Sequence, residues 1–126
     1  MIKTISTKNA PTPFGPYSQA IVANGFVFCS GQIGTNPQTG ILANGVEEQA
    51  HQILKNLQGV LEEANSSLEH VLKTTIFITN ISDFSKINSI YEEYFPAHKP
   101  ARATVEVSNL PKGALIEIEA IAVASS

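Results

Sequence analysis

The sequence predicts an α+β fold in which a mixed sheet of five or six strands has two helices packed on one face. Two segments, at about 46–64 and 84–95, repeat apolar residues with the spacing of a helix. The segments around them are short and rich in β-branched residues, which favours strands. The predicted order is β-β-α-β-α-β-β, with residues 2–6 as a candidate for a further short strand. A chain of 126 residues suits one core, so residues 1–126 are expected to form a single domain.

The N-terminal part is predicted to be a loop followed by a hairpin. Residues 9–18 hold three prolines and one glycine, which exclude a regular helix or strand. Asn24-Gly25 is typical of a two-residue turn, and it joins strands predicted at 19–23 and 26–30. Residues 31–45 are rich in Gly, Asn, Pro and Thr and are expected to form a loop.

Both predicted helices have recognisable end signals. Asn44 is the expected N-cap of the first helix, and Glu47 would complete a capping box. The second helix is expected to be capped by Ser82 or Asp83 and to be stopped by Pro96. The remaining strands are predicted at 70–79, 102–107 and 115–123.

Charge and cysteine content argue against several classes of protein. The net charge is −3 and the basic residues are scattered, whereas nucleic-acid binders usually carry a basic stripe. The three histidines lack metal-ligand spacing, the one cysteine cannot pair within the chain, and no nucleotide-binding glycine motif occurs. We therefore expect no metal, no cofactor and no nucleic-acid partner. No signal peptide or membrane-length apolar segment is visible, which predicts a cytoplasmic protein with no membrane partner.

The last strand is apolar on both faces, which predicts burial on both. One face carries four apolar residues, and the other carries three apolar residues together with Glu117 and Glu119. Two helices can cover only one face, so we expect further copies of the chain to cover the second. An unpaired buried carboxylate is costly. Glu117 and Glu119 therefore reach solvent or pair with a cation, or else they line a polar pocket.

Arg102 is the only arginine in the chain, and it begins a strand just after Lys99-Pro100. A guanidinium on a proline-stiffened strand end suits bidentate binding of a carboxylate. The alternatives are an ordinary surface arginine or an ion pair with Glu106 or Glu117.

Other polar or unusual residues have both a structural and a functional interpretation. Asn88 falls within the inward stripe of the second helix and must find hydrogen bonds there. Tyr17 either packs the proline-rich loop or covers a pocket. Ser30 and Gly31 either form a turn or let a ligand approach the backbone. Cys29 lies within an apolar run, which favours a core thiol over a nucleophile.

Motifs along most of the chain carry a family resemblance. Near the N-terminus stands Gly15-Pro-Tyr-Ser-Gln-Ala, and after the hairpin stands Cys29-Ser-Gly-Gln-Ile-Gly. The helices carry Asn56-Leu and Asn88-x-x-Tyr-x-x-Tyr-Phe, and the C-terminal part contains Lys99-Pro-Ala-Arg-Ala-Thr-Val-Glu-Val-x-x-Leu-Pro-Lys-Gly-Ala-Leu-Ile-Glu-Ile-Glu-Ala-Ile-Ala. In these motifs the chain resembles the Rid family, also called YjgF or L-PSP, of reactive intermediate (imine and enamine) deaminases.

The resemblance implies a fold, an assembly and an activity. The implied fold is chorismate-mutase-like, with a mixed six-stranded sheet and two helices packed on one face. The implied assembly is a homotrimer with a site at each subunit interface. The implied activity is that of a 2-iminobutanoate/2-iminopropanoate deaminase, a hydrolase acting on C=N bonds. It converts 2-imino acids, or their enamine tautomers, to 2-oxo acids and ammonia without a cofactor or metal.

The resemblance also implies roles for individual residues. Arg102 would bind the substrate carboxylate, Tyr17 would close the pocket, and Glu117 would position the attacking water. The other implied substrate-binding residues are Ser30, Gly31, Asn88 and Thr104.

Thr104 departs from the family pattern, because many bacterial members carry cysteine at this position. It is expected either to substitute as a polar contact or to shift the substrate preference. A cysteine there cannot be an obligate nucleophile if threonine is tolerated.

Two other functions stay open. One is a small-carboxylate-binding or regulatory module without turnover. The other is an endoribonuclease, an activity reported for some relatives, against which the acidic balance of charge counts.

Overall fold

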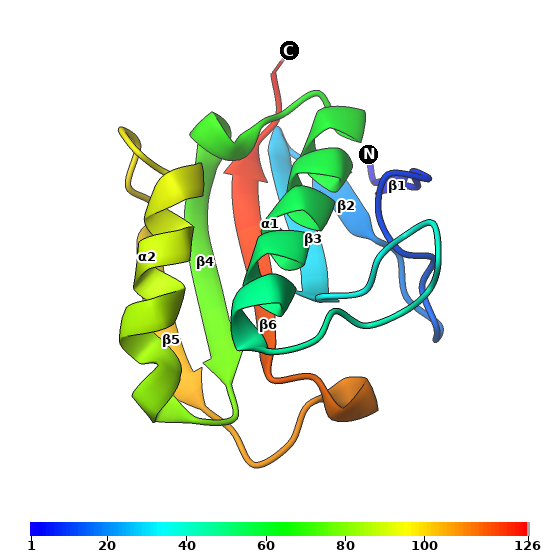
Figure 1. Cartoon of the computed structure of the whole chain (residues 1–126). Helices are drawn as coiled ribbons and strands as arrows, with labels where there is room; N and C mark the ends of the chain where they lie inside the picture. The colour runs from blue at the N-terminus through cyan, green and yellow to red at the C-terminus, as the bar shows by residue number, and fades with distance from the viewer. Residues whose placement is uncertain (126) are drawn as a thin grey trace.

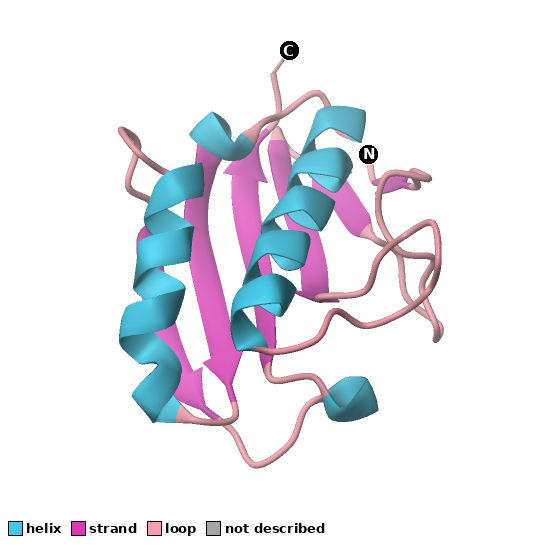
Figure 2. Cartoon of the chain, in the orientation of Figure 1, coloured by secondary structure: helices cyan, strands magenta, loops and turns pink. Residues whose placement is uncertain are grey.

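The computed structural model describes residues 1–125, so Ser126, the last residue of the predicted 1–126 domain, lies outside it. The chain forms one six-stranded sheet in the order β1-β2-β3-β6-β4-β5. The β4–β5 pair is parallel and the other pairs are antiparallel, so the sheet is mixed as predicted (Figures 1 and 2). The strands are β1 Lys3–Ile5, β2 Ala20–Ala23, β3 Phe26–Ile33, β4 Val71–Ile78, β5 Ala101–Glu106 and β6 Ile116–Val123.

Two α-helices cover one face of this sheet, which confirms the predicted arrangement (Figure 1). Helix α1 spans Val46–Glu63 and α2 spans Phe84–Tyr94. Short 3-10 helices occur at Leu68–His70 (η1), Ile81–Asp83 (η2) and Pro111–Gly113 (η3). Within residues 1–125, no helix is both long enough and apolar enough to cross a bilayer.

The core lies between the sheet and the helices. In β6, Ile116, Ile118, Ala120 and Ala122 are buried in it, and α1 contributes the largest set of apolar side chains. Truncation of one such side chain to alanine typically costs about 2–5 kcal/mol, because it loses burial and leaves a cavity. The core residues of α1 are Val46, Ala50, Ile53, Leu54, Leu57, Val60 and Leu61.

The other face of the sheet is largely open in a single chain. Phe26 and Phe28 of β3 and Val105 of β5 are between 41% and 47% exposed. On β6, Ile121 and Val123 are only half-buried. The prediction that both faces of the last strand are buried is therefore met on one face only within one chain. Whether further copies of the chain cover the second face stays a prediction.

Most element boundaries lie within one residue of the prediction, but β3 does not end at Ser30. The strand continues to Ile33, and its register with β6 shifts between Cys29 and Gln32. Such a bulge keeps the strand going while it changes the direction of the side chains. The Asn24-Gly25 turn is confirmed, since both residues have the positive φ of a two-residue hairpin turn, 52° and 79°.

The predicted cap of the first helix is wrong, and that of the second is right in position only. Gly45, not Asn44, is the N-cap residue of α1, and no side chain caps it. The φ of Gly45 is 89°, a value that only glycine adopts easily, so backbone geometry decides this start. At α2, Asp83 is the N-cap residue but makes no capping bond. Instead, the Asn80 side chain accepts a hydrogen bond from the Ser82 N–H and caps η2.

Gly59→Ala is expected to destabilise the fold, although alanine is the better helix former by about 1 kcal/mol. A β-carbon at position 59 would lie 2.7 Å from the carbonyl oxygen of Asn9, which is backbone and cannot rotate away. Urea unfolding should therefore show a lower midpoint for this variant. Gln58→Ala, exposed on the same helix, is the control and should stay within about 0.5 kcal/mol of wild type. A higher midpoint for Gly59→Ala would contradict the close contact.

Candidate functional site

The predicted site residues lie on two opposite faces of the sheet. In β5, Arg102 and Thr104 pair with Thr74 and Ile76 of β4, whose side chains are 1% and 0% exposed beneath the helices. Paired residues of neighbouring strands point to the same face, so Arg102 and Thr104 lie on the helix side. Glu117 stands between buried residues of β6 and therefore points to the open face.

The strand order also separates Arg102 from Glu117 laterally. Arg102 is on β5 and Glu117 is on β6, and β4 lies between these two strands. Among residues 1–125, no carboxylate lies within 4.0 Å of the Arg102 guanidinium. Glu106 instead accepts a hydrogen bond from the Ile81 N–H at 2.7 Å. The alternative of an ion pair with Glu106 or Glu117 is therefore excluded within one chain.

Arg102 lies against aromatic rings of α2. Its Cζ atom is 4.9 Å from the ring centre of Tyr91 and 5.4 Å from that of Phe84. Contacts of this kind attract a cation through the electron-rich face of the ring. An open cleft of about 410 Å³ is lined by Arg102 and neighbouring residues of α2 and of the segment before β5. Those residues are Asn88, Tyr91, Glu92, Phe95, Lys99 and Pro100.

Two polar atoms on this side of the sheet have no hydrogen-bond partner within residues 1–125. They are Oδ1 of Asn88 on α2 and Oγ1 of Thr104 on β5, and both are buried. An unsatisfied buried polar group costs about 1–3 kcal/mol, so proteins rarely leave one without reason. Both atoms belong to residues predicted for substrate binding. Each atom can accept a hydrogen bond from a group outside residues 1–125, such as a water molecule or a ligand.

The second group of predicted residues surrounds Glu117. A β-carbon on Gly31 would overlap the Glu117 carboxylate, so Gly31 and Glu117 are in close contact and a side chain at position 31 would displace this carboxylate. Burial raises the pKa of Glu117, and the negative charge of Glu119 raises it further. A half-buried carboxyl with a raised pKa can accept a proton more readily than a solvated one.

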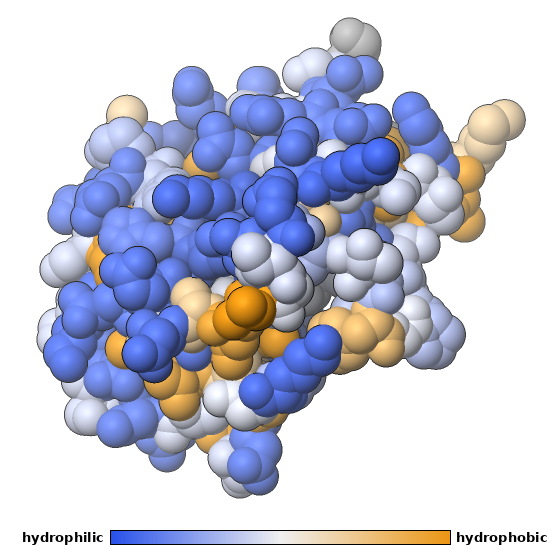
Figure 3. All heavy atoms as spheres, turned by 45° about the vertical axis from the view of Figure 1, so that its right-hand side comes forward, coloured by the Kyte–Doolittle hydropathy of each residue, from blue (hydrophilic) through white to orange (hydrophobic). Residues whose placement is uncertain are grey.

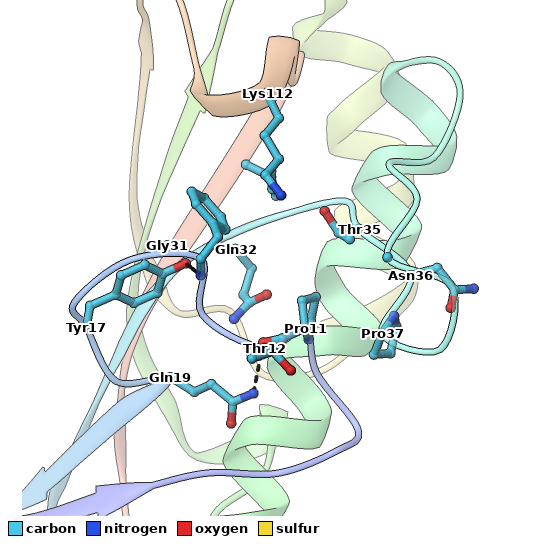
Figure 4. Close-up of a pocket in the computed structure, with 13 residues that line it drawn as sticks. Pro11, Thr12, Tyr17, Gln19, Gly31, Gln32, Thr35, Asn36, Pro37 and Lys112 are labelled. Atoms are coloured by element: carbon cyan, nitrogen blue, oxygen red, sulfur yellow. Dashed lines mark hydrogen bonds between the residues drawn. The ribbon is translucent and has the colours of Figure 1, made fainter.

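Tyr17 lies beside Gly31 on the rim of a cavity of about 160 Å³ (Figure 4). The Tyr17 hydroxyl accepts a hydrogen bond from the Phe14 N–H at 3.4 Å, and the two rings meet edge to face. Ser30 already has partners for both of its donors. Its N–H donates to Gln19 O at 3.0 Å and its hydroxyl to Ser18 O at 2.6 Å. Gly31 is thus the better candidate for a backbone contact to a ligand.

The molecular surface on this side is mainly hydrophilic, with apolar side chains gathered in the lower part of the view (Figure 3). Tyr17 and Phe14 are 41% and 54% exposed. Large apolar side chains at the surface often mark places where another molecule binds.

Cys29 is a core thiol, as predicted. It is buried, and burial raises its pKa to about 12, so almost none of the nucleophilic thiolate exists at neutral pH. In the described part of the chain, no group of three or more His, Cys, Asp or Glu residues is arranged to hold a metal ion.

The sequence interpretation missed the residues that surround Arg102. The sequence patterns assign no site role to Tyr91 of the second predicted helix or to Thr74 of the strand predicted at 70–79. In the structure, the Tyr91 hydroxyl and Thr74 Oγ1 form a buried hydrogen bond of 2.7 Å. The available signal was a tyrosine on an inward helix face, since a buried phenol requires a partner.

Comparison with known proteins covers nearly the whole chain. The family model described as Endoribonuclease L-PSP matches residues 7–124. A human protein named 2-iminobutanoate/2-iminopropanoate deaminase is 45% identical over 122 residues, which are 96% of this chain and 89% of the human one.

Solved structures agree with this result. The Rid-family protein YyfA from Yersinia pestis, described as of unknown function, has a TM-score of 0.96 and is 53% identical. The match covers 98% of this chain and 100% of YyfA. The structure of E. coli TdcF with bound serine has a TM-score of 0.93 at 42% identity, and the match covers 98% of each chain. The chain therefore belongs to the Rid family, the family predicted from its motifs.

Proposed function

We propose that this protein hydrolyses 2-imino acids, such as 2-iminobutanoate and 2-iminopropanoate, to 2-oxo acids and ammonia. The observation that carries the proposal is the Arg102 guanidinium, which faces a cleft without a carboxylate partner among residues 1–125. A ligand carboxylate fits this cation, because guanidinium binds carboxylate through two parallel hydrogen bonds. The name of the human relative and the serine bound to TdcF support a substrate of the amino-acid type.

A complete site requires a second copy of the chain. Arg102, Asn88 and Thr104 lie on the helix side of the sheet, whereas Gly31 and Glu117 meet on the other side. We propose a homotrimer in which Tyr17, Gly31 and Glu117 of one copy face Arg102 of the next. The largely open apolar face of the sheet and the unpartnered atoms of Asn88 and Thr104 support such contacts.

The proposed chemistry needs only positioning and one proton acceptor. Arg102 fixes the substrate carboxylate, and a proton on the imine nitrogen makes the neighbouring carbon electrophilic. Glu117 accepts a proton from a water molecule as the water oxygen bonds to that carbon. The protonated Glu117 then gives this proton to the nitrogen of the carbinolamine. As the C–N bond breaks, the hydroxyl group loses its proton and forms the C=O bond, so ammonia leaves the 2-oxo acid. Thr104 acts as a hydroxyl contact to the bound molecule and not as a nucleophile.

A binding module without turnover is the second candidate. It is favoured by one observation: a single chain presents the carboxylate-binding group and the proton acceptor on opposite faces. A cytoplasmic location stays a prediction, as does the absence of a nucleic-acid partner.

Arg102→Ala is expected to lower kcat/KM by about a hundredfold or more, because it removes two charge-assisted hydrogen bonds. Arg102→Lys should fall between this variant and wild type, since lysine keeps the charge but loses the fork of two donors. The assay is release of 2-oxo acid from freshly generated 2-aminoacrylate. Lys86→Met, which removes an exposed cation of α2, is the control. Wild-type protein without any acceleration would leave only the binding function.

Mixing two inactive variants tests whether the site is shared between copies. Arg102→Ala and Glu117→Gln each remove one half-site but leave the other intact. In mixed trimers formed at equal amounts, about one quarter of the interfaces would combine two intact halves, and activity should return to about that fraction of wild type. Each variant alone stays inactive in the same assay. If mixing restores nothing although mixed trimers are detected, the shared site is ruled out.

The acid side of the pH profile should report Glu117. Its pKa is raised above the ordinary value of 4.5, so kcat/KM should fall as pH drops through a midpoint above 4.5. Glu119→Gln removes the neighbouring negative charge, so the midpoint should move to lower pH. The measurement is kcat/KM between pH 4 and 8 for both proteins, with buffers held at constant ionic strength. An upward shift in Glu119→Gln would contradict this role of Glu117.

A further inference from the structure

An aromatic seat formed by Tyr91 and Phe84 lies against the only arginine of the chain. We propose that Tyr91 is the positioning residue of the carboxylate-binding site: held by Thr74, it orients the Arg102 guanidinium for its ligand. This inference rests on the proposed role of Arg102, but it can be tested without any enzyme assay.

The helix presents both rings to the same strand. Phe84 and Tyr91 are seven residues apart in α2, which is about two turns, so they lie on one side of the helix. Their ring centres are 5.4 and 4.9 Å from Cζ of Arg102. Phe84 is partly exposed at the helix start, whereas Tyr91 is 8% exposed. Tyr91 is therefore the more firmly held of the two.

Tyr91 is fixed at both its hydroxyl and its ring. The hydroxyl shares a 2.7 Å hydrogen bond with Thr74 Oγ1, and the Thr74 side chain is 1% exposed. Thr74 pairs with Arg102 in the parallel β4–β5 ladder. The residue that holds the Tyr91 hydroxyl is therefore the direct neighbour of Arg102 in the sheet. The ring of Phe95 packs at 4.6 Å from that of Tyr91. The ring position is thus determined by the core, which a ligand does not disturb.

An aromatic seat suits an arginine that must stay available. A carboxylate partner would occupy the N–H donors and neutralise the charge that a ligand carboxylate needs. A ring contacts the guanidinium without using a donor as a hydrogen-bond partner, because cation–π attraction acts through the ring face. The raised pKa of Tyr91, caused mainly by burial, keeps its hydroxyl neutral at physiological pH, so it does not compete with the ligand.

The first test observes the guanidinium directly. Because Arg102 is the only arginine, its Nε–Hε group gives a single side-chain signal in a ¹⁵N NMR spectrum. In wild type we expect a signal shifted by the rings, with relaxation like that of the rigid backbone. Tyr91→Leu should move this signal and make it mobile. The matched control is Tyr94→Leu on the same helix, because Tyr94 bonds to His51 and is not a ring partner of Arg102. An unchanged signal in Tyr91→Leu would contradict the proposal that the Tyr91 ring orients the Arg102 guanidinium.

The second test measures what the orientation contributes to binding. With 2-oxobutanoate as the probe, Tyr91→Leu should raise the Kd by about tenfold. The free energy of such a change is in the range of partly buried cation–π contacts. Tyr91→Phe with Thr74→Val keeps the ring but removes both hydroxyls of the anchor, and should weaken binding less. If Tyr91→Leu fails to fold, the same measurements on this double variant test the positioning role of Tyr91. Tyr94→Leu should bind as wild type does.

The outcomes separate this inference from the proposed activity. A mobile guanidinium with an unchanged Kd would overturn the positioning role. If no imine hydrolysis is found in wild type but Tyr91→Leu loosens Arg102 and weakens 2-oxobutanoate binding, the deaminase proposal fails while the positioning role stands.

Discussion

The fold of this protein leaves the Arg102 guanidinium without a carboxylate partner in the described chain. Arg102 is the second residue of the edge strand β5, lies under α2 and contacts two aromatic rings. Its charge is stabilised by rings and by partial exposure, so its hydrogen-bond donors stay available. Asn88 and Thr104 place two further unpartnered polar atoms in the same layer. The unpaired guanidinium is the feature that supports the proposed binding of a small carboxylate.

The sheet topology places the proton acceptor elsewhere. β4 separates β5 from β6, and strand alternation turns Glu117 to the face opposite Arg102. Within a single chain, Arg102 and Glu117 therefore cannot both contact one small molecule. The proposed trimer resolves this, because the same contact that covers the apolar face would bring the two half-sites together.

The sequence was sufficient for most of the fold, and less so for the site. Period-3.6 and period-2 patterns located the helices and strands. From the pattern alone, Arg102 had several interpretations, and its carboxylate-binding role rests on the family resemblance and stays a prediction. The strand order was not predictable, because local patterns do not encode which strands pair. For that reason the sequence could not exclude an ion pair between Arg102 and Glu117, which β4 separates. Gly45 and not Asn44 is the N-cap residue of α1, because the backbone there has a positive φ that glycine adopts most easily. The hydrogen bond between Thr74 and Tyr91 joins residues 17 positions apart in the chain. It forms only when α2 packs on the sheet, so no local pattern indicates it.

The central claim is that one bound molecule touches Arg102 of one copy and Glu117 of another. A crystal structure of the protein with 2-oxobutanoate tests it most directly. The account predicts the ligand carboxylate on the Arg102 guanidinium, seated over Tyr91, with Glu117 of a neighbouring copy across the site. A ligand bound away from Arg102, or an Arg102 site to which no other copy contributes, would contradict it.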